Sequence, residues 1–274
     1  MTIKKIWAIY FSPTGNAKKV AITMARSAAR MLDVHVEAYD FTLPENRAGV
    51  KEFEVSDLVF FVMPVYAGRL PNKILPYVQS GFSGNGALAV PVVVYGNRSF
   101  DGALMELRNE LESHGFHTIA AAGIPTEHVF SSVLGTGRPD ESDLVDIANF
   151  GEEVARKISD MNEIPERIDV PGDDFVSIYY TPLGTDGKPA VFLKAKPVTD
   201  TAICTRCGAC VSVCPMGSIP ADAPYTCTGI CIKCQACIKV CQQSAKHMED
   251  AAFLSHVEML KQNYTQRKEV QWFI

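Results

Sequence analysis

Eight of the nine cysteines fall into two copies of one spacing, C-x2-C-x2-C-x3-C. Three thiols at every third position let a tight loop wrap one iron–sulfur cube, because thiolates are soft donors that suit iron. The fourth corner of the cube then needs a more distant thiol. The spacing therefore predicts iron–sulfur ligands at Cys204, Cys207, Cys210 and Cys214 in the first copy, and at Cys231, Cys234, Cys237 and Cys241 in the second.

A zinc site and a disulfide framework are the alternatives for these cysteines. Zinc sites usually pair two C-x2-C motifs across a longer gap and use four ligands, so a triple motif leaves surplus thiols. The ninth cysteine, Cys227, lies four residues before Cys231. We expect Cys227 to be an unligated thiol, and a role as an alternative ligand stays open.

A second chemical signal lies near the amino terminus, in the segment YFSPTGNAKKVA. It offers hydroxyls at Ser12 and Thr14, a flexible Gly15, and Asn16 at the start of a predicted helix. Such a turn can bind a phosphate through backbone N–H groups, side-chain donors and the positive end of the helix. A plain helix cap is the alternative, because serine and threonine are also preferred at that position.

The elements that must position these residues alternate between strands and helices. Hydrophobic periodicity predicts strands at residues 4–11, 34–38, 57–63, 88–95 and 116–123, and helices at residues 17–32, 71–80, 102–113 and 140–158. Asp101 is the candidate N-cap of the third helix. The alternation predicts a parallel doubly wound sheet. Pro91, within the fourth strand, counts against a central and fully paired position for that strand.

Two further loops follow apolar strands: PVYAGRLPN after the third strand and YGNRSFDGAL after the fourth. Ligands of open parallel sheets lie beyond the carboxyl ends of the strands, at the point where the strand order reverses. We therefore expect both loops to meet the phosphate-type turn on one rim of the sheet.

On the evidence of these three loops, residues 1 to about 158 resemble a flavodoxin. The resemblance implies FMN as the ligand and a five-stranded sheet in the order 2-1-3-4-5. The implied FMN-binding residues are Ser12, Thr14, Gly15, Asn16 and Ala17 in the phosphate turn, Pro64, Tyr66, Ala67, Gly68 and Arg69 in the first ring loop, and Tyr95, Gly96, Asn97, Arg98 and Phe100 in the second.

Three of these residues raise questions within the resemblance. Ala17 stands where the family usually has a threonine, and this removes one hydroxyl donor worth roughly 1 kcal/mol. Arg69 and Arg98 would either stabilise a reduced, anionic flavin or form ordinary solvated salt bridges, and both interpretations stay open.

The cysteine-rich stretch closely resembles the two-cluster bacterial ferredoxins, in which the fourth cysteine of each run ligates the other cluster. Pro215 matches the proline that follows the fourth cysteine in that family, whereas Gln242 does not match it. The resemblance implies two [4Fe-4S] clusters, one held by Cys204, Cys207, Cys210 and Cys241 and the other by Cys231, Cys234, Cys237 and Cys214.

The whole chain thus resembles a flavodoxin-like α/β protein fused to a smaller, α+β ferredoxin-like domain. We expect a flavodoxin-like FMN-binding domain over residues 1–159, a structured connector over 160–200, a ferredoxin domain over 201–250 and a helical tail over 251–274. A hairpin in the segment VSIYYTPLGTDGKPAVFL is compatible with the connector's spacing of prolines and glycines.

Composition narrows the classes of partner. The net charge of -5 argues against nucleic acid, and no apolar run approaches the about 20 residues that cross a bilayer, so we expect no membrane insertion. The amino terminus is interpreted as a strand rather than a secretion signal. Together with nine cysteines this indicates a reducing cytoplasm.

These features predict an electron carrier that passes electrons between FMN, the two clusters and low-potential redox proteins, as in anaerobic metabolism. An oxidoreductase that uses the same groups to reduce a quinone-like, flavin or ferric substrate is the alternative, and a redox sensor is a third hypothesis. We assign no catalytic residue and no role to any of the six histidines. A homodimer stays open.

Overall fold

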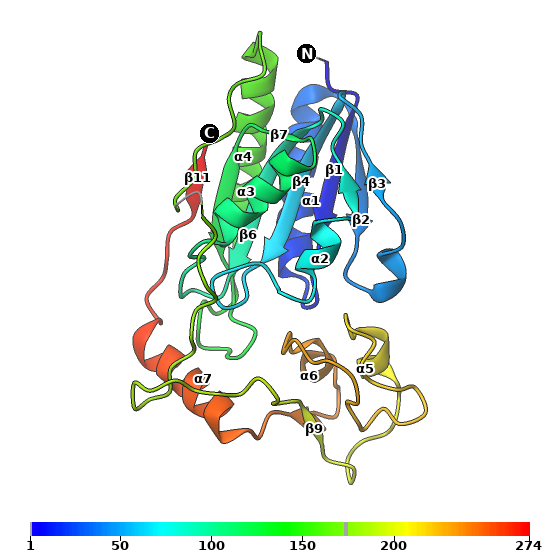
Figure 1. Cartoon of the computed structure of the whole chain (residues 1–274), viewed down its shortest axis with the longest axis vertical. Helices are drawn as coiled ribbons and strands as arrows, with labels where there is room; N and C mark the ends of the chain where they lie inside the picture. Colours follow the sequence, from blue (N-terminus) through cyan, green and yellow to red (C-terminus); the bar gives the residue numbers. More distant parts are fainter. Residues whose placement is uncertain (1, 173–174) are drawn as a thin grey trace.

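The computed structural model describes residues 2–172 and 175–274. Its main sheet has the strand order β11-β8-β6-β4-β1-β2, with the short β7 also paired to β6 (Figure 1). Only β11 is antiparallel to its neighbour. The strands of this sheet are β1 (Lys5–Tyr10), β2 (His35–Asp40), β4 (Asp57–Pro64), β6 (Leu88–Tyr95), β7 (His117–Thr118), β8 (Ala121–Pro125) and β11 (Gln271–Phe273).

The five principal parallel strands, β2-β1-β4-β6-β8, follow the predicted order 2-1-3-4-5, which is the flavodoxin-like order of doubly wound sheets. Strands β4 and β6 are buried along almost their whole length. Their continuous apolar runs are explained by helices on both faces of the sheet. The predicted fold class is confirmed.

Two layers of helices cover the sheet. Helices α1 (Asn16–Leu32) and α4 (Glu141–Asp160) pack on one face, while α2 (Leu75–Val78) and α3 (Ala103–Ser113) pack on the other. Gly151 lets α4 approach α1 closely, since a Cβ at this position would lie 2.6 Å from the Met24 carbonyl oxygen. The rim at the carboxyl ends of the strands is left free for loops.

The expectation that Pro91 would keep its strand from a central position is wrong. Strand β6 pairs with both β4 and β8. The carbonyls of Ala87, Ala89 and Tyr95 accept hydrogen bonds from the β7 and β8 side, so the missing N–H of Pro91 faces the same side. On that side the predicted fifth strand is interrupted between β7 and β8. The sheet therefore loses no backbone hydrogen bond at Pro91.

Two predicted helices differ from the observed ones. Only Leu75–Val78 is α-helical within residues 71–80. Asp101 does not cap α3: Gly102 occupies the N-cap position, and the Asp101 carboxylate instead pairs with Arg98. The ion pair with Arg98 holds the Asp101 side chain in the loop before α3, so it does not cap the helix.

Eight further elements of the described residues lie outside the main sheet and its covering helices, and all but α7 have two to four residues. The predicted tail contains one helix, α7 (Ala251–Asn263), after which the chain returns to the sheet as β11 and Trp272 stacks on Phe150. These elements are η1 (Pro44–Asn46), β3 (Lys51–Glu52), β5 (Phe82–Ser83), β9 (Val198–Thr199), α5 (Ala209–Ser212), α6 (Ala236–Lys239), β10 (Lys246–His247) and α7 (Ala251–Asn263).

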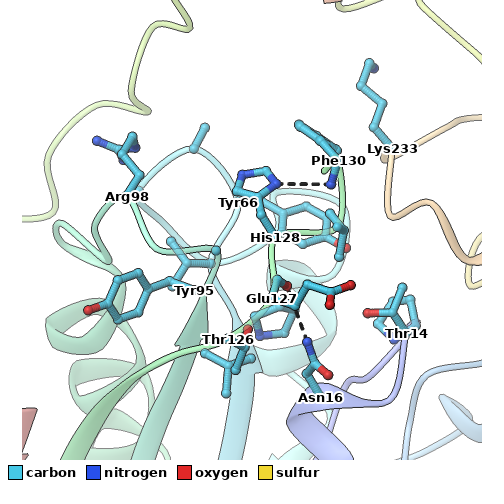
Figure 2. Close-up of a pocket in the computed structure, with 18 of the residues that line it drawn as sticks. Thr14, Asn16, Tyr66, Tyr95, Arg98, Thr126, Glu127, His128, Phe130 and Lys233 are labelled. Atoms are coloured by element: carbon cyan, nitrogen blue, oxygen red, sulfur yellow. Dashed lines mark hydrogen bonds between the residues drawn. The ribbon is translucent and has the colours of Figure 1, made fainter. Parts of the chain in front are cut away.

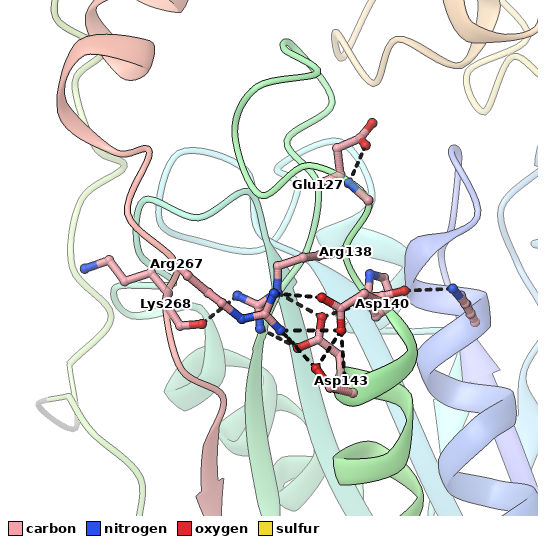
Figure 3. A network of polar contacts seen from close by, with 10 residues as sticks. Glu127, Arg138, Asp140, Asp143, Arg267 and Lys268 are labelled. Atoms are coloured by element: carbon pink, nitrogen blue, oxygen red, sulfur yellow. Dashed lines mark hydrogen bonds and ion pairs between the residues drawn. The ribbon is translucent and has the colours of Figure 1, made fainter.

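A polar network holds the returning tail against the start of α4 (Figure 3). The buried Arg138 guanidinium makes two hydrogen bonds to the Asp143 carboxylate, at 2.9 and 2.6 Å, and also donates to the Lys268 carbonyl. Arg267 donates to Asp140 at 2.7 Å and to Asp143 at 2.9 Å. The carboxyl terminus is thereby a fixed part of the α/β layer.

The connector lies along the ring loops instead of extending as a free linker. The Tyr180 N–H donates to the Ala67 carbonyl at 2.8 Å, and the Tyr179 hydroxyl donates to the Leu70 carbonyl at 2.9 Å. The predicted hairpin is reduced to one bridge between Leu183 and Pro189. Within the described ranges, no helix has the length and apolarity needed to cross a membrane.

Candidate cofactor sites

The structure gathers the eight motif cysteines into two separate cavities. Each cavity is lined by three cysteines of one run and the last cysteine of the other run. The first cavity contains Cys204, Cys207, Cys210 and Cys241. The second contains Cys231, Cys234, Cys237 and Cys214. These are the two interlocked sets that the ferredoxin resemblance implies.

All nine cysteines are free thiols. Among the described residues, no three His, Cys, Asp or Glu side chains converge closely enough to hold a single metal ion. The cysteines of each set instead surround a space, and a cube needs its four thiolates at separate corners. Cys227 also lines the second cavity, so that cavity has a fifth thiol in its wall.

The two cysteine runs share one backbone conformation. Positive φ values occur at Arg206 and Lys233, each two residues after the first cysteine of its run, and again at Gly208 and Gln235, each two residues further on. A third pair, Gly217 and Ser244, keeps the same offset. Left-handed residues other than glycine are uncommon, so the repeat indicates that both runs wrap their cavity in the same way.

Backbone N–H groups stabilise a thiolate at Cys241. Burial raises the pKa of this thiol, but hydrogen bonds from the N–H groups of Gln243, Ala245 and Lys246 outweigh it and lower the pKa overall. Burial dominates at Cys234 and raises its pKa to about 12. A thiolate there needs metal coordination to offset its desolvation. The donor sets therefore fit [4Fe-4S] clusters.

A third cavity lies on the rim of the sheet, where the three predicted loops meet (Figure 2). It contains residues from the phosphate turn and from both ring loops, as the strand-end rule predicts. The predicted FMN residues that line it are Ser12, Thr14, Asn16, Ala17, Pro64, Tyr66, Ala67, Gly68, Tyr95, Gly96 and Arg98. We call this space the flavin cavity.

Two hydrogen bonds of Ser12 fix the phosphate turn, one to α1 and one to the segment after β2. The Ser12 Oγ accepts from the Lys18 N–H in the first turn of α1 at 2.9 Å, and its backbone N–H donates to Thr42. Gly15 has a φ of 96° and is the N-cap of α1. The left-handed conformation favours glycine there, and it starts the helix directly behind the turn. The arrangement fits a phosphate at the helix N-terminus.

The first ring loop is a tight turn closed by two backbone hydrogen bonds between Tyr66 and Arg69. Gly68 has a φ of 78°, and a Cβ at this position would lie 2.2 Å from the Asp101 carboxylate. Glycine is therefore required both by the conformation and by the close approach. This contact joins the two ring loops.

Four predicted FMN residues lie outside the wall of the flavin cavity: Gly15, Arg69, Asn97 and Phe100. Arg69 forms an ion pair with the buried Glu106 and stacks on Tyr179, which favours the salt-bridge interpretation of this arginine. Asn97 is fully buried, and its amide donates to the Tyr264 and Gln266 carbonyls at 2.6 and 2.8 Å.

Arg98 does line the cavity, and its charge is compensated there. It pairs with Asp101 and lies 4.0 Å from the centre of the Tyr180 ring. The salt-bridge interpretation of Arg98 is therefore supported, and a role in stabilising a reduced flavin stays a prediction.

Sequence reasoning missed the loop that follows β8. Thr126, Glu127 and His128 line the flavin cavity, and the Asn16 amide donates to the Glu127 carbonyl at 3.4 Å (Figure 2). The rule that ligands lie beyond strand ends could have found this loop, because it leaves the same rim. His128 packs over Gly96, where a Cβ would lie 2.3 Å from the imidazole.

The cavity also has a roof that no local pattern indicated. It is formed by Tyr180 and Phe192 of the connector and by His256 of α7. Burial lowers the pKa of His128 to about 4, with smaller effects from His256 and Arg98, and burial also lowers the pKa of His256. Burial thus favours the neutral form of both imidazoles.

The second cysteine set adjoins the flavin cavity directly. Ile232 and Lys233, which lie between Cys231 and Cys234, form part of the flavin cavity wall. Burial, followed by the neighbouring thiols of Cys234 and Cys231, raises the pKa of the Tyr66 phenol well above its usual range. Tyr66 therefore lines the flavin cavity and lies within electrostatic range of the second cysteine set.

Comparison with known proteins agrees with the cysteine motif. Residues 197–219 match the family model of a 4Fe-4S binding domain. No curated protein sequence matches the chain.

Solved structures with a similar fold include three that cover the α/β region. A flavodoxin from the domain Archaea is 17% identical and covers 57% of this chain and 99% of its own, with a TM-score of 0.39. Oxidised flavodoxin 2 from Bacillus cereus is 16% identical over 56% and 99%, with a TM-score of 0.42. An apo NADH:FMN oxidoreductase is 17% identical over 58% and 91%, with a TM-score of 0.41.

The strand order and the family match together define the molecule in general terms. The chain joins a flavodoxin-like α/β domain to a 4Fe-4S binding domain. This combination indicates a redox function based on a flavin and on iron–sulfur chemistry.

Proposed function

We propose that this protein is an electron-transfer protein that relays electrons between FMN, two [4Fe-4S] clusters and external low-potential redox proteins. The observation that carries the proposal is the shared wall between two sites. Ile232 and Lys233 belong to the loop of the second cysteine set and at the same time line the flavin cavity. No separate partner is needed to bring the two redox groups together.

FMN is the flavin that the cavity fits best. A phosphate-type turn at the start of α1 forms one end of the cavity, and the two ring loops form another part of its wall. Ser12, Thr14 and Asn16 would hold the phosphate, and Tyr66 would flank the ring. When bound, FMN supplies the exchange of two electrons in separate steps, whereas each cluster exchanges one.

The order of the relay follows from the placement of the cysteine sets. The Cys214, Cys231, Cys234 and Cys237 set adjoins the flavin cavity, so its cluster would be the neighbour of FMN. The other set includes Cys207, which is exposed. We propose that redox proteins exchange electrons at that outer cluster.

Anaerobic reconstitution with iron, sulfide and FMN tests this function. We expect about eight irons and one FMN per chain, and a reductive titration should show flavin and both clusters exchanging electrons within one molecule. The titration is followed by optical and electron paramagnetic resonance spectroscopy. A reconstituted chain that holds about four irons, or that does not retain FMN, would contradict the relay.

An oxidoreductase that acts on a small molecule is the second candidate. It is favoured by the roof over the flavin cavity and by the two neutral imidazoles within it. Electron transfer between cofactors needs neither feature.

A further inference from the structure

Part of the flavin cavity wall comes from segments that lie far from the ring loops in sequence. Tyr180 is bound to the first ring loop through its N–H, and Phe192 packs between Phe253 and His256, with ring centres 5.5 Å from each. His256 is itself fixed by a 2.8 Å hydrogen bond from Nδ1 to the Leu183 carbonyl. These contacts fix three side chains of the connector and α7 in the wall of the flavin cavity.

The two imidazoles of the cavity wall offer complementary hydrogen-bonding atoms. The His128 Nδ1 accepts from the Phe130 N–H at 3.1 Å, so the neutral ring carries its proton on Nε2. In His256 the Nδ1 donates, so the neutral ring has a free lone pair on Nε2. Within residues 2–172 and 175–274, neither Nε2 atom makes a hydrogen bond to the protein.

The walls around these atoms favour a planar ligand. Tyr180, Phe192 and Phe130 provide aromatic surface. The cavity's guanidinium, Arg98, is already paired with Asp101, and Lys233 donates to the Leu193 carbonyl. The charge of Arg98 is thus compensated, and a carbonyl oxygen of a ligand could accept a hydrogen bond from His128 Nε2.

We propose that the roofed part of the flavin cavity is a binding site for a neutral, planar conjugated carbonyl compound of the quinone class, with His128 Nε2 donating a hydrogen bond to one carbonyl oxygen. The inference rests on the proposed relay, which would deliver electrons to this site. Reduction of the quinone to its hydroquinone consumes two electrons from the relay and two protons from solvent, and it converts both C=O groups to C–OH.

Calorimetric titration with 1,4-naphthoquinone tests the site without turnover. The protein carries FMN and both clusters in their oxidised states, and no electron donor is present. We expect saturable binding below about 1 mM. His128→Leu should weaken binding by about tenfold, since it removes the donor and keeps a side chain of similar bulk. His117→Leu, which changes an exposed histidine on β7, should leave binding unchanged.

Phe192→Ala is a second variant in case His128→Leu loses FMN, and it should also weaken binding because it removes a wall of the site. Wild-type protein that shows no saturable binding, or variants that bind as tightly as wild type, would overturn the inference. Iron content, FMN content and reduction of the flavin through the clusters are measured on the same samples. A failed relay is seen in those measurements and removes both proposals, whereas a working relay without quinone binding overturns only this one.

Discussion

Lys246 is a buried lysine whose charge acts on both cysteine sets. The residue is 3% exposed, and its Nζ donates to the Thr199 hydroxyl at 2.7 Å. Burial raises the pKa of Cys210 in one set and of Cys237 in the other, and the charge of Lys246 opposes the rise in both. A cation that acts on both sets should stabilise an added electron on either cluster.

Replacing this charge should lower the reduction potentials of the clusters. For Lys246→Met we expect a shift of tens of millivolts, on the order of what one nearby charge produces at an intermediate dielectric constant. Lys246→Arg keeps the charge and is the matched control. The measurement is a redox titration followed by electron paramagnetic resonance, and equal potentials in Lys246→Met and wild type would show that the ammonium does not act on the clusters.

The beginning of α4 is the element on which the carboxyl-terminal tail depends. Asp140 caps the helix by accepting from the Asp143 N–H at 3.0 Å. Arg138 binds Asp143, and Arg267 binds both Asp140 and Asp143. The network thus joins the cap of a central helix to the segment that leads into β11 (Figure 3).

Removing the buried cation of this network should destabilise the fold strongly. Arg138 and Asp143 are each 3% exposed in their side chains, so Arg138→Met leaves the buried Asp143 carboxylate with only the solvent-exposed Arg267 as its cation. We expect the free energy of unfolding to fall by about 3–5 kcal/mol in chemical denaturation. The double variant Arg138→Met/Asp143→Leu removes both charges and should recover most of the loss. Equal losses in the single and double variants would contradict this explanation.

The exposed part of the network should respond to acid. The hydrogen bond from Arg267, followed by those from the Asp143 N–H and the Ser142 hydroxyl, holds the pKa of Asp140 below its ordinary value of 3.8. A lowered pKa in the folded state stabilises the protein above the unfolded value, and this contribution is lost as the pH falls below it.

Thermal unfolding of Arg267→Gln therefore provides a pH test. Its Tm should lie below that of wild type at about pH 6–8, and the difference should narrow as the pH falls below about 4. Ser159→Ala, which changes a residue at the other end of α4, is the control for general effects on the helix. A difference in Tm that stays constant into acid would exclude Asp140 as its source.

At the scale of the whole molecule, the cysteine-rich segment is fixed against the α/β domain by several contacts. Arg47, just after η1, donates to the Pro215 carbonyl, which follows a cysteine of the second set. Met216 and Ile232 pack against the aromatic face of the sheet, and Lys239 pairs with Glu127 at 3.1 Å. The distance between flavin cavity and second cysteine set is therefore set by the fold.

Loosening this interface should slow internal electron transfer without loss of cofactors. For Arg47→Ala we expect a several-fold slower exchange between FMN and the clusters, because the segment loses its anchor beside Cys214. Arg26→Ala, on the exposed side of α1, is the control. Flash reduction of the flavin followed by absorbance gives the rate, and an unchanged rate with full iron and FMN content would show that Arg47 does not hold the cofactors together.

The sequence by itself determined the local features of both domains. Three cysteines of each set lie within seven residues, so their spacing alone predicts the loop that brings them together. The apolar strands of residues 57–64 and 88–95 likewise show their burial in their composition, and the alternation of elements determines the sheet class.

Only the tertiary structure decided which side chains face the cavities. Asn97 is turned away from the flavin cavity because its amide binds carbonyls near residue 265, and Arg69 is turned away because Glu106 captures it. The roof at Tyr180 and His256 comes from segments more than 75 residues beyond the ring loops. Hydrophobic periodicity reports the burial of a residue within its own element, and it contains no information about contacts over such separations.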